Sequence, residues 1–158
     1  MMKIEVKNVK MHRDMSEETE CFSCTIYVDG KKAGEASNRG GGGCNEYHFA
    51  DRKVEQSVHD YIDTLPEIPL PADAEDWAKS IYPMKQDLDW FVGELVQDAE
   101  ADKRLRRLAK KKTLFRIEGE TYAYGEWLIL NHPYEDGVGE WLKDKYAGKQ
   151  VEIYGVTA

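Results

Sequence analysis

The stretch CFSCTIYVDGKKAGEAS, residues 21–37, combines two strand patterns with a tight turn between them. Its first half, 21–28, is rich in Thr, Ile, Tyr and Val, whose side chains fit a pleated sheet. Asp29 and Gly30 follow, and both tolerate the positive φ that a two-residue hairpin turn requires. The sequence therefore predicts a β-hairpin whose returning strand covers 31–37.

Strand and helix patterns continue on both sides of this hairpin. Residues 2–10 alternate between charged and apolar side chains, which is typical of a half-buried strand. Residues 45–49 read as a short fourth strand, and 51–65 carry apolar side chains at helical spacing. Pro66 ends that helix, because proline has no N–H to donate and clashes with the preceding turn.

A proline-rich connector follows, over 66–83. Each proline biases the residue before it away from the helical conformation, so we expect an extended chain with one short helical segment at 74–81. Apolar residues within 85–111 then recur at helical spacing and predict one long helix.

The C-terminal part repeats the hairpin pattern. Strands are predicted over 113–118 and 121–130, around a turn at Gly119 and Glu120, and a last strand is predicted over 151–156. Before that last strand, four side chains at helical spacing predict a helix with one apolar face: Val138, Trp141, Leu142 and Tyr146.

These elements predict an α+β fold, with largely antiparallel hairpins in the N- and C-terminal parts packed around one long central helix. At 158 residues the chain fits a single compact domain, 1–158. Two lobes are the alternative, with a hairpin plus helix over 1–65 and the long helix plus a ββαβ pattern over 85–158, joined by the connector 66–83.

Charge and composition narrow the class of protein. A formal net charge of −8 disfavours non-specific binding of the whole molecule to nucleic acid or to anionic membranes. The apolar runs are a few residues long, against the ~20 that span a bilayer, so we expect no membrane association. The start of the sequence lacks the apolar segment of a signal peptide. An odd number of cysteines without such a signal favours reduced thiols in the cytoplasm.

Cys21, Cys24, Cys44 and His48 have the spacing C-x2-C-x19-C-x3-H, which superficially matches a zinc site with three cysteines and one histidine. Cys21 and Cys24, however, lie three residues apart in a predicted strand, so their side chains point to opposite faces. We therefore expect free thiols, no bound metal and no cofactor.

Cys44 and His48 alone are candidates for a nucleophile and its base. In an extended segment the two side chains share one face but lie ~13 Å apart, which is too far for a hydrogen bond. A hydrolase or transferase that uses this pair is therefore the second alternative function.

Four consecutive glycines, 40–43, form the least ordinary local feature. Backbone N–H groups in such a run are able to converge on an anion, and Arg39 adds positive charge. The run lacks the Gly-Lys-Ser/Thr ending of a phosphate-binding loop, and no helix pattern follows it directly. We therefore interpret the segment as a contact for a protein partner and call it the glycine loop: Asn38, Arg39, Gly40, Gly41, Gly42 and Gly43.

The end of the predicted long helix is strongly basic, with seven positive charges in the ten positions 103–112. Such a cluster suits the negative C-terminal end of the helix dipole, and it also suits the phosphates of a nucleic acid. Nucleic-acid binding is therefore the first alternative function, through Lys103, Arg104, Arg106, Arg107, Lys110, Lys111 and Lys112.

No motif of a kinase, phosphate-loop enzyme, dinucleotide binder, zinc protease or serine hydrolase is present in the sequence. The main interpretation is therefore a small, acidic, non-enzymatic interaction or inhibitor protein, of phage or mobile-element origin, that binds a protein partner. Its predicted binding surface joins the glycine loop to two aromatic residues of the C-terminal hairpin, Tyr124 and Trp127.

Overall fold

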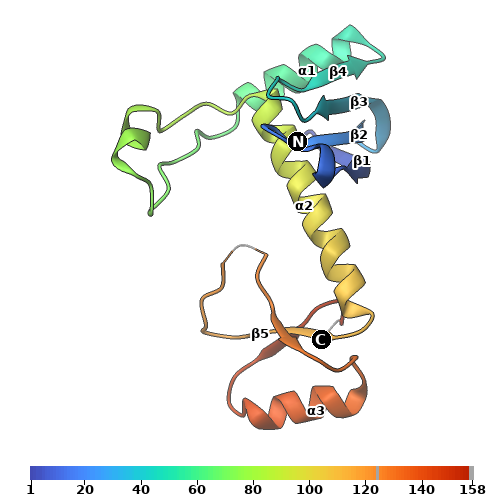
Figure 1. Cartoon of the computed structure of the whole chain (residues 1–158), viewed down its shortest axis with the longest axis vertical. Helices are drawn as coiled ribbons and strands as arrows, with labels where there is room; N and C mark the ends of the chain where they lie inside the picture. The colour runs from blue at the N-terminus through green and yellow to red at the C-terminus, as the bar shows by residue number, and fades with distance from the viewer. Residues whose placement is uncertain (124, 157–158) are drawn as a thin grey trace. The chain divides into compact units, whose positions relative to one another are not determined.

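The computed structural model describes residues 1–123 and 125–156 and confirms the predicted α+β fold (Figure 1). Two antiparallel sheets and their helices group into two compact units, Met1–Ala99 and Glu100–Ala158. The division lies inside the long helix α2 (Leu88–Ala109), so the proline-rich connector belongs to the first unit. We call them unit 1 and unit 2 and describe each by itself. None of the helices in the described part of the chain has both the length and the apolar composition that crossing a bilayer requires.

Unit 1 contains a four-stranded antiparallel sheet in the order β1-β2-β3-β4. The predicted hairpin is confirmed, because Val28 pairs with Lys31 across Asp29 and Gly30, which both have the positive φ of the turn. The strands are β1 (Ile4–Met11), β2 (Cys21–Val28), β3 (Lys31–Arg39) and β4 (Glu46–Phe49).

Two helices complete the core of unit 1. The helix α1 (Arg52–Asp63) begins at Asp51, whose carboxylate accepts a hydrogen bond from the Lys53 backbone. The start of α2 is held in the same way by Asp87, which accepts from the Trp90 N–H at 2.8 Å. Side chains from both helices pack with the inward side chains of β2: Phe22, Cys24, Ile26, Val58, Ile62, Val92 and Val96.

The connector between α1 and α2 forms an arm, which we define as residues 66–84. Backbone hydrogen bonds of 2.8 and 3.2 Å between Ile68 and Met84 close its base. The short helical segment expected within it is the 3-10 helix η2 (Asp76–Ser80). In Figure 1 the arm, coloured green, extends away from the sheet and helices of unit 1.

Unit 2 contains a three-stranded antiparallel sheet in the order β6-β5-β7, the C-terminal half of α2 and the helix α3 (Asp136–Lys145). Phe115 and Ile117 of the central strand pack with Val138 and Leu142 of α3 into a separate small core. The strands are β5 (Thr113–Ile117), β6 (Leu128–Leu130) and β7 (Val151–Ile153).

The strand predicted over 121–130 is wrong except at β6. Residues 118–123 and 125–127 have irregular structure, and Glu126 forms two of the hydrogen bonds that hold them. The Glu126 carboxylate accepts from the Ala123 N–H at 2.9 Å, and the Glu126 carbonyl accepts from Arg116 Nε at 2.8 Å. These local bonds replace the ladder that a longer hairpin would form.

Trp141 does not join the core of unit 2, as its spacing predicts, but is 46% exposed. Val138 and Leu142 lie four residues apart and fill the apolar face of α3, whereas Trp141 is rotated by about 100° from Leu142. The Lys145 ammonium lies 4.7 Å from the centre of the Trp141 ring, so a cation covers part of this side chain.

Candidate functional site

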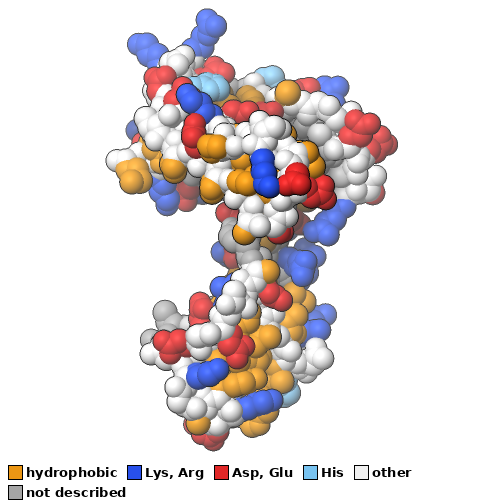
Figure 2. All heavy atoms as spheres, turned by 90° about the vertical axis from the view of Figure 1, so that its left-hand side faces the viewer, with side chains coloured by type: hydrophobic (Ala, Val, Ile, Leu, Met, Phe, Trp, Pro, Cys, Tyr) orange, Lys and Arg blue, Asp and Glu red, His pale blue; other side chains and the backbone are white. Residues whose placement is uncertain are grey.

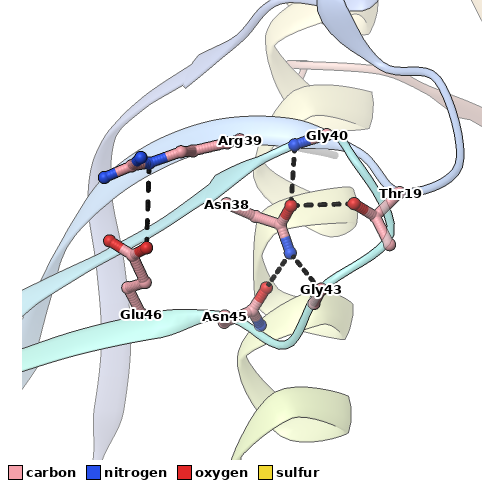
Figure 3. A network of polar contacts seen from close by, with 7 residues as sticks. All are labelled: Thr19, Asn38, Arg39, Gly40, Gly43, Asn45 and Glu46. Carbon is pink, nitrogen blue, oxygen red and sulfur yellow. Dashed lines mark hydrogen bonds and ion pairs between the residues drawn. The ribbon is translucent and has the colours of Figure 1, made fainter.

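The glycine loop is held in place by the side chain of Asn38, which is only 8% exposed. Its Oδ1 accepts hydrogen bonds from the Gly40 N–H and from the Thr19 hydroxyl, both at 2.8 Å. Its Nδ2 donates to the Gly43 carbonyl at 2.9 Å and to Asn45 Oδ1 at 3.0 Å. Figure 3 shows how this one amide joins both ends of the loop to a neighbouring segment, which gives the loop a defined conformation.

Two of the four glycine N–H groups point into the protein. Gly40 donates to Asn38, and Gly42 donates to the Thr19 hydroxyl at 3.2 Å. The Gly40 carbonyl in turn accepts from the backbone N–H groups of residues 17–19. The anion-binding interpretation of the loop gains no support from this geometry, because these amides already have partners.

The exposed part of the glycine loop consists of Arg39 and residues 41–43. The Arg39 side chain extends toward Glu46 on β4, with 3.7 Å between Nε and Oε1. Both side chains are mostly exposed, so this ion pair leaves Arg39 accessible to a partner.

A polar network connects the loop to the start of α2. Asn45 Nδ2 donates to the Tyr47 hydroxyl at 2.9 Å, and that hydroxyl donates to Asp89 Oδ1 at 2.8 Å. The Asn45 backbone N–H donates to the second oxygen of Asp89 at 3.2 Å. Burial, with the Asp89 carboxylate next to it, raises the pKa of Tyr47, so this phenol stays protonated as a donor. These bonds fix the end of the loop to a helix.

The two residues of the candidate nucleophile–base pair have different surroundings in the structure. Cys44 lines a shallow depression of about 380 Å³ that α1 and the start of α2 also line, with His59 and Asp63 among its residues. His48 does not line this depression; it lies on β4 opposite Glu35. Within the described residues, no group of three or more His, Cys, Asp or Glu side chains is arranged to hold a metal ion.

The three cysteines are unpaired and differ in exposure. Cys44 is exposed, whereas Cys21 and Cys24 of β2 are buried. Burial raises the pKa of the Cys24 thiol to about 11, because the apolar core disfavours the charged thiolate.

We expect one of the three thiols to react rapidly in the native protein. Cys44 should react with a disulfide reagent at pH 8 within seconds, while the two buried thiols react only in denaturant. Relative to a thiol with the ordinary pKa of 9.0, Cys24 has about 100-fold less thiolate, in addition to being shielded. Counting the released chromophore with and without urea measures this, and C44S should remove the rapid phase. Two rapid equivalents, or a rapid phase that survives C44S, would contradict the placement of the thiols.

The arm displays large apolar side chains that sequence reasoning did not single out. Trp77 is 64% and Ile81 50% exposed, and Leu70 is exposed as well. Trp77 Nε1 donates to Glu75 Oε2 at 2.9 Å, which orients the indole without covering it. Figure 2 turns this side of unit 1 to the viewer and shows hydrophobic beside acidic side chains in its upper part. The sequence does contain a sign of this surface, since a tryptophan and an isoleucine lie four residues apart in a segment bounded by prolines.

Trp127 and Tyr124, the predicted aromatic contacts, belong to unit 2, whereas the glycine loop belongs to unit 1. Trp127 is partly buried; the Arg116 guanidinium lies 4.2 Å from its ring centre, and Tyr154 packs edge-on at 5.3 Å. Tyr124 lies outside the described residues. Trp127 therefore contacts side chains of its own unit and is only partly accessible.

A wider groove of about 850 Å³ lies in unit 2, between the ends of β5 and β7 and one side of α3. Its charged side chains have both signs, with Arg116 and Lys143 beside Glu118, Glu120 and Glu152. Mixed charge of this kind favours no class of small ligand.

The predicted basic patch covers the last turns of α2 and the three residues that follow it, 110–112, in unit 2. Six of its seven side chains are exposed, and Lys112 is partly buried. Lys103 and Arg106 have acidic partners one helical turn away, Glu100 at 3.7 Å and Asp102 at 2.7 Å.

No protein-family model, curated protein or solved structure matches this chain. The class of protein therefore follows from its own fold: an α+β protein of two compact units. Its candidate surfaces are the arm and the exposed glycine loop in unit 1, and the basic patch in unit 2.

Proposed function

We propose that this chain is a non-enzymatic, acidic interaction or inhibitor protein that binds a protein partner through the arm. The observation that carries the proposal is the exposure of Trp77 and Ile81 on a segment that leaves the body of unit 1. Tryptophan is among the residues most enriched at the energetic centres of protein interfaces.

The arm is built in a way that suits the insertion of its side chains into a pocket on a partner protein. Its base is closed by the Ile68–Met84 hydrogen bonds, so the segment between them is a closed loop. Within it, Trp77 lies in the 3-10 helix η2, and Ile81 directly follows the last residue of that helix. A partner pays less conformational entropy to bind side chains that are already ordered.

The charge of the arm indicates the chemistry of the partner. Four acidic side chains lie within it, and its one basic residue, Lys79, is paired with Asp76 at 2.6 Å. A pocket that accepts the indole and is rimmed by Lys or Arg would be complementary in both shape and charge. An anionic lipid surface would repel the same segment.

The glycine loop is proposed as a second contact in the same unit. Arg39 and residues 41–43 are exposed, while Asn38 and Gly40 hold them in one conformation. We also place the protein in the cytoplasm, since its three free cysteines suit a reducing compartment.

A photo-crosslinker placed at position 77 tests the proposal directly. The full chain, with a photoreactive phenylalanine in place of Trp77, is irradiated in cells of the organism that encodes it. The crosslinked products are compared with those from a chain that carries the same probe in place of Trp141. Trp141 is the matched control, because it is also an exposed tryptophan, 46% accessible, but lies in unit 2.

We expect one discrete product at position 77 that is absent at position 141. The captured protein, once purified, should bind the wild-type chain and lose ~30-fold or more in affinity to W77A, the effect of a typical energetic centre. A W141A variant should bind as the wild type does. Equal products at both positions, or full affinity in W77A, would exclude the arm as the binding surface.

A further inference from the structure

The cations at the end of α2 lie on one side of the helix. At about 100° per residue, the four exposed basic side chains inside α2, at 103, 104, 106 and 107, fall within an arc of roughly 160°. The exposed Lys110 and Lys111 follow in the turn directly after the helix. The partly buried Leu105, Leu108 and Ala109 lie on the opposite side of the helix. We define the basic face as Lys103, Arg104, Arg106, Arg107, Lys110 and Lys111.

Most of this face has no compensating charge. Among the residues that the structure describes, Arg104, Arg107, Lys110 and Lys111 form no ion pair with a carboxylate. The Asp102 carboxylate next to the face is shared, since it pairs with Arg106 and also accepts from the Tyr154 hydroxyl at 2.5 Å. Four adjacent unpaired cations repel one another, and an anionic ligand would relieve that repulsion.

The helix dipole does not account for a cluster of this size. The C-terminal end of a helix carries about half a negative charge, and its effect fades beyond the last turn. Arg104 lies five residues before the end of α2, more than one turn away. The dipole therefore stabilises the last cations of the face only.

We propose that the basic face binds the phosphate backbone of nucleic acid. An acidic protein partner is the competing occupant, but the buried centre of a protein interface is apolar and depleted in charged residues. No large hydrophobic side chain between 103 and 111 is exposed, so this face has cations and no such centre. Contacts to phosphates are made by Arg and Lys side chains and need no apolar centre.

The distribution of charge between the two units predicts the affinity and the salt dependence of nucleic-acid binding. Unit 1 has eleven basic and twenty acidic side chains, a formal charge of −9, whereas unit 2 has eleven and ten, a charge of +1. Phosphates are therefore attracted by unit 2 and repelled by unit 1. We expect sequence-independent binding with Kd in the range of roughly 10⁻⁴ to 10⁻⁶ M and a steep dependence on salt.

Fluorescence anisotropy with a labelled 20-base-pair DNA duplex and with the corresponding single strand tests the proposal on the full chain. A triple variant, Arg104→Gln, Arg107→Gln and Lys111→Gln, removes three unpaired cations and keeps good helix formers. The matched control, Lys143→Gln, Lys145→Gln and Lys149→Gln, removes the same charge from exposed positions elsewhere in unit 2. Circular dichroism of both variants checks that the helices are intact.

We expect the wild-type chain to bind at least one of the two DNA probes at about 50 mM salt and to release it at several-fold higher salt. The basic-face variant should bind at least 10-fold more weakly, with the slope of log K against log salt reduced by about 2 to 3. The control variant should remain within about 2-fold of wild type. No binding to either probe at low salt, or equal losses in the two variants, would overturn the proposal. Binding to poly-glutamate without binding to DNA would instead assign the face to an acidic protein.

Discussion

Replacing Gly40 with alanine is expected to destabilise unit 1 by about 3 kcal/mol, which lowers its melting temperature by roughly 10 °C. Gly40 has a φ of +84°, a conformation that strains any residue with a Cβ atom. A Cβ there would lie 2.2 Å from the Met15 carbonyl oxygen, which belongs to the backbone and has no flexible side chain to move aside. The loop must therefore shift, and its hydrogen bonds to Asn38 and to residues 17–19 weaken.

Gly41 provides the matched control for this variant. An added Cβ at Gly41 meets nothing within 4 Å, and its φ lies outside the left-handed region. G41A should be neutral, or more stable by about 0.5 kcal/mol because alanine restricts the unfolded chain. Urea unfolding followed by circular dichroism measures both variants under the same conditions. If G40A unfolds at the same urea concentration as G41A, the glycine loop is not held as the Asn38 network implies.

The N-terminal hairpin could be predicted from the sequence because its signals are local. Residues 21–28 alternate, and Asp29 and Gly30 define the turn. The two-residue loop fixes the register next to the turn, which then shifts at an irregularity between Ile26 and Tyr27. The helices α1 and α2 begin at aspartates that precede an apolar repeat, which is also a local signal.

The role of Asn38 could not be predicted in the same way. In the sequence it is one polar residue before a glycine run, and such residues are common in turns. Its amide binds groups at positions 19, 40, 43 and 45, and the bond to Thr19 depends on how the loop before β2 folds back. Only tertiary structure brings Thr19 into reach.

The exposed surface of the arm could not be predicted from the sequence either, because the exposure of a side chain is not a local property. Trp77 and Ile81 have the spacing of a short helical segment, and such side chains are usually buried. Whether they pack on the unit or extend from it depends on the path of the chain between Ile68 and Met84. The sequence therefore predicted the short helical segment but not the exposure of its apolar side chains.

Replacing Leu142 with alanine is expected to unfold unit 2 selectively. The Leu142 side chain is fully buried against Phe115 and Ile117, and its truncation costs about 2 to 5 kcal/mol. A unit of this size buries a smaller fraction of its surface than a larger domain does, so its stability is of the same order as this loss. Hydrogen exchange should show β5 and α3 losing their protection, while β2 and β3 of unit 1 keep theirs.

Ile129 is the control for Leu142, because its replacement by alanine removes the same number of carbon atoms from the same unit. The Ile129 side chain is 50% exposed on β6, so I129A should cost about 1 kcal/mol or less and leave exchange nearly unchanged. A loss of protection in L142A that spreads equally to β2 and β3 would show that the two units unfold as one cooperative domain. An effect of L142A no larger than that of I129A would show that α3 does not form the core of unit 2.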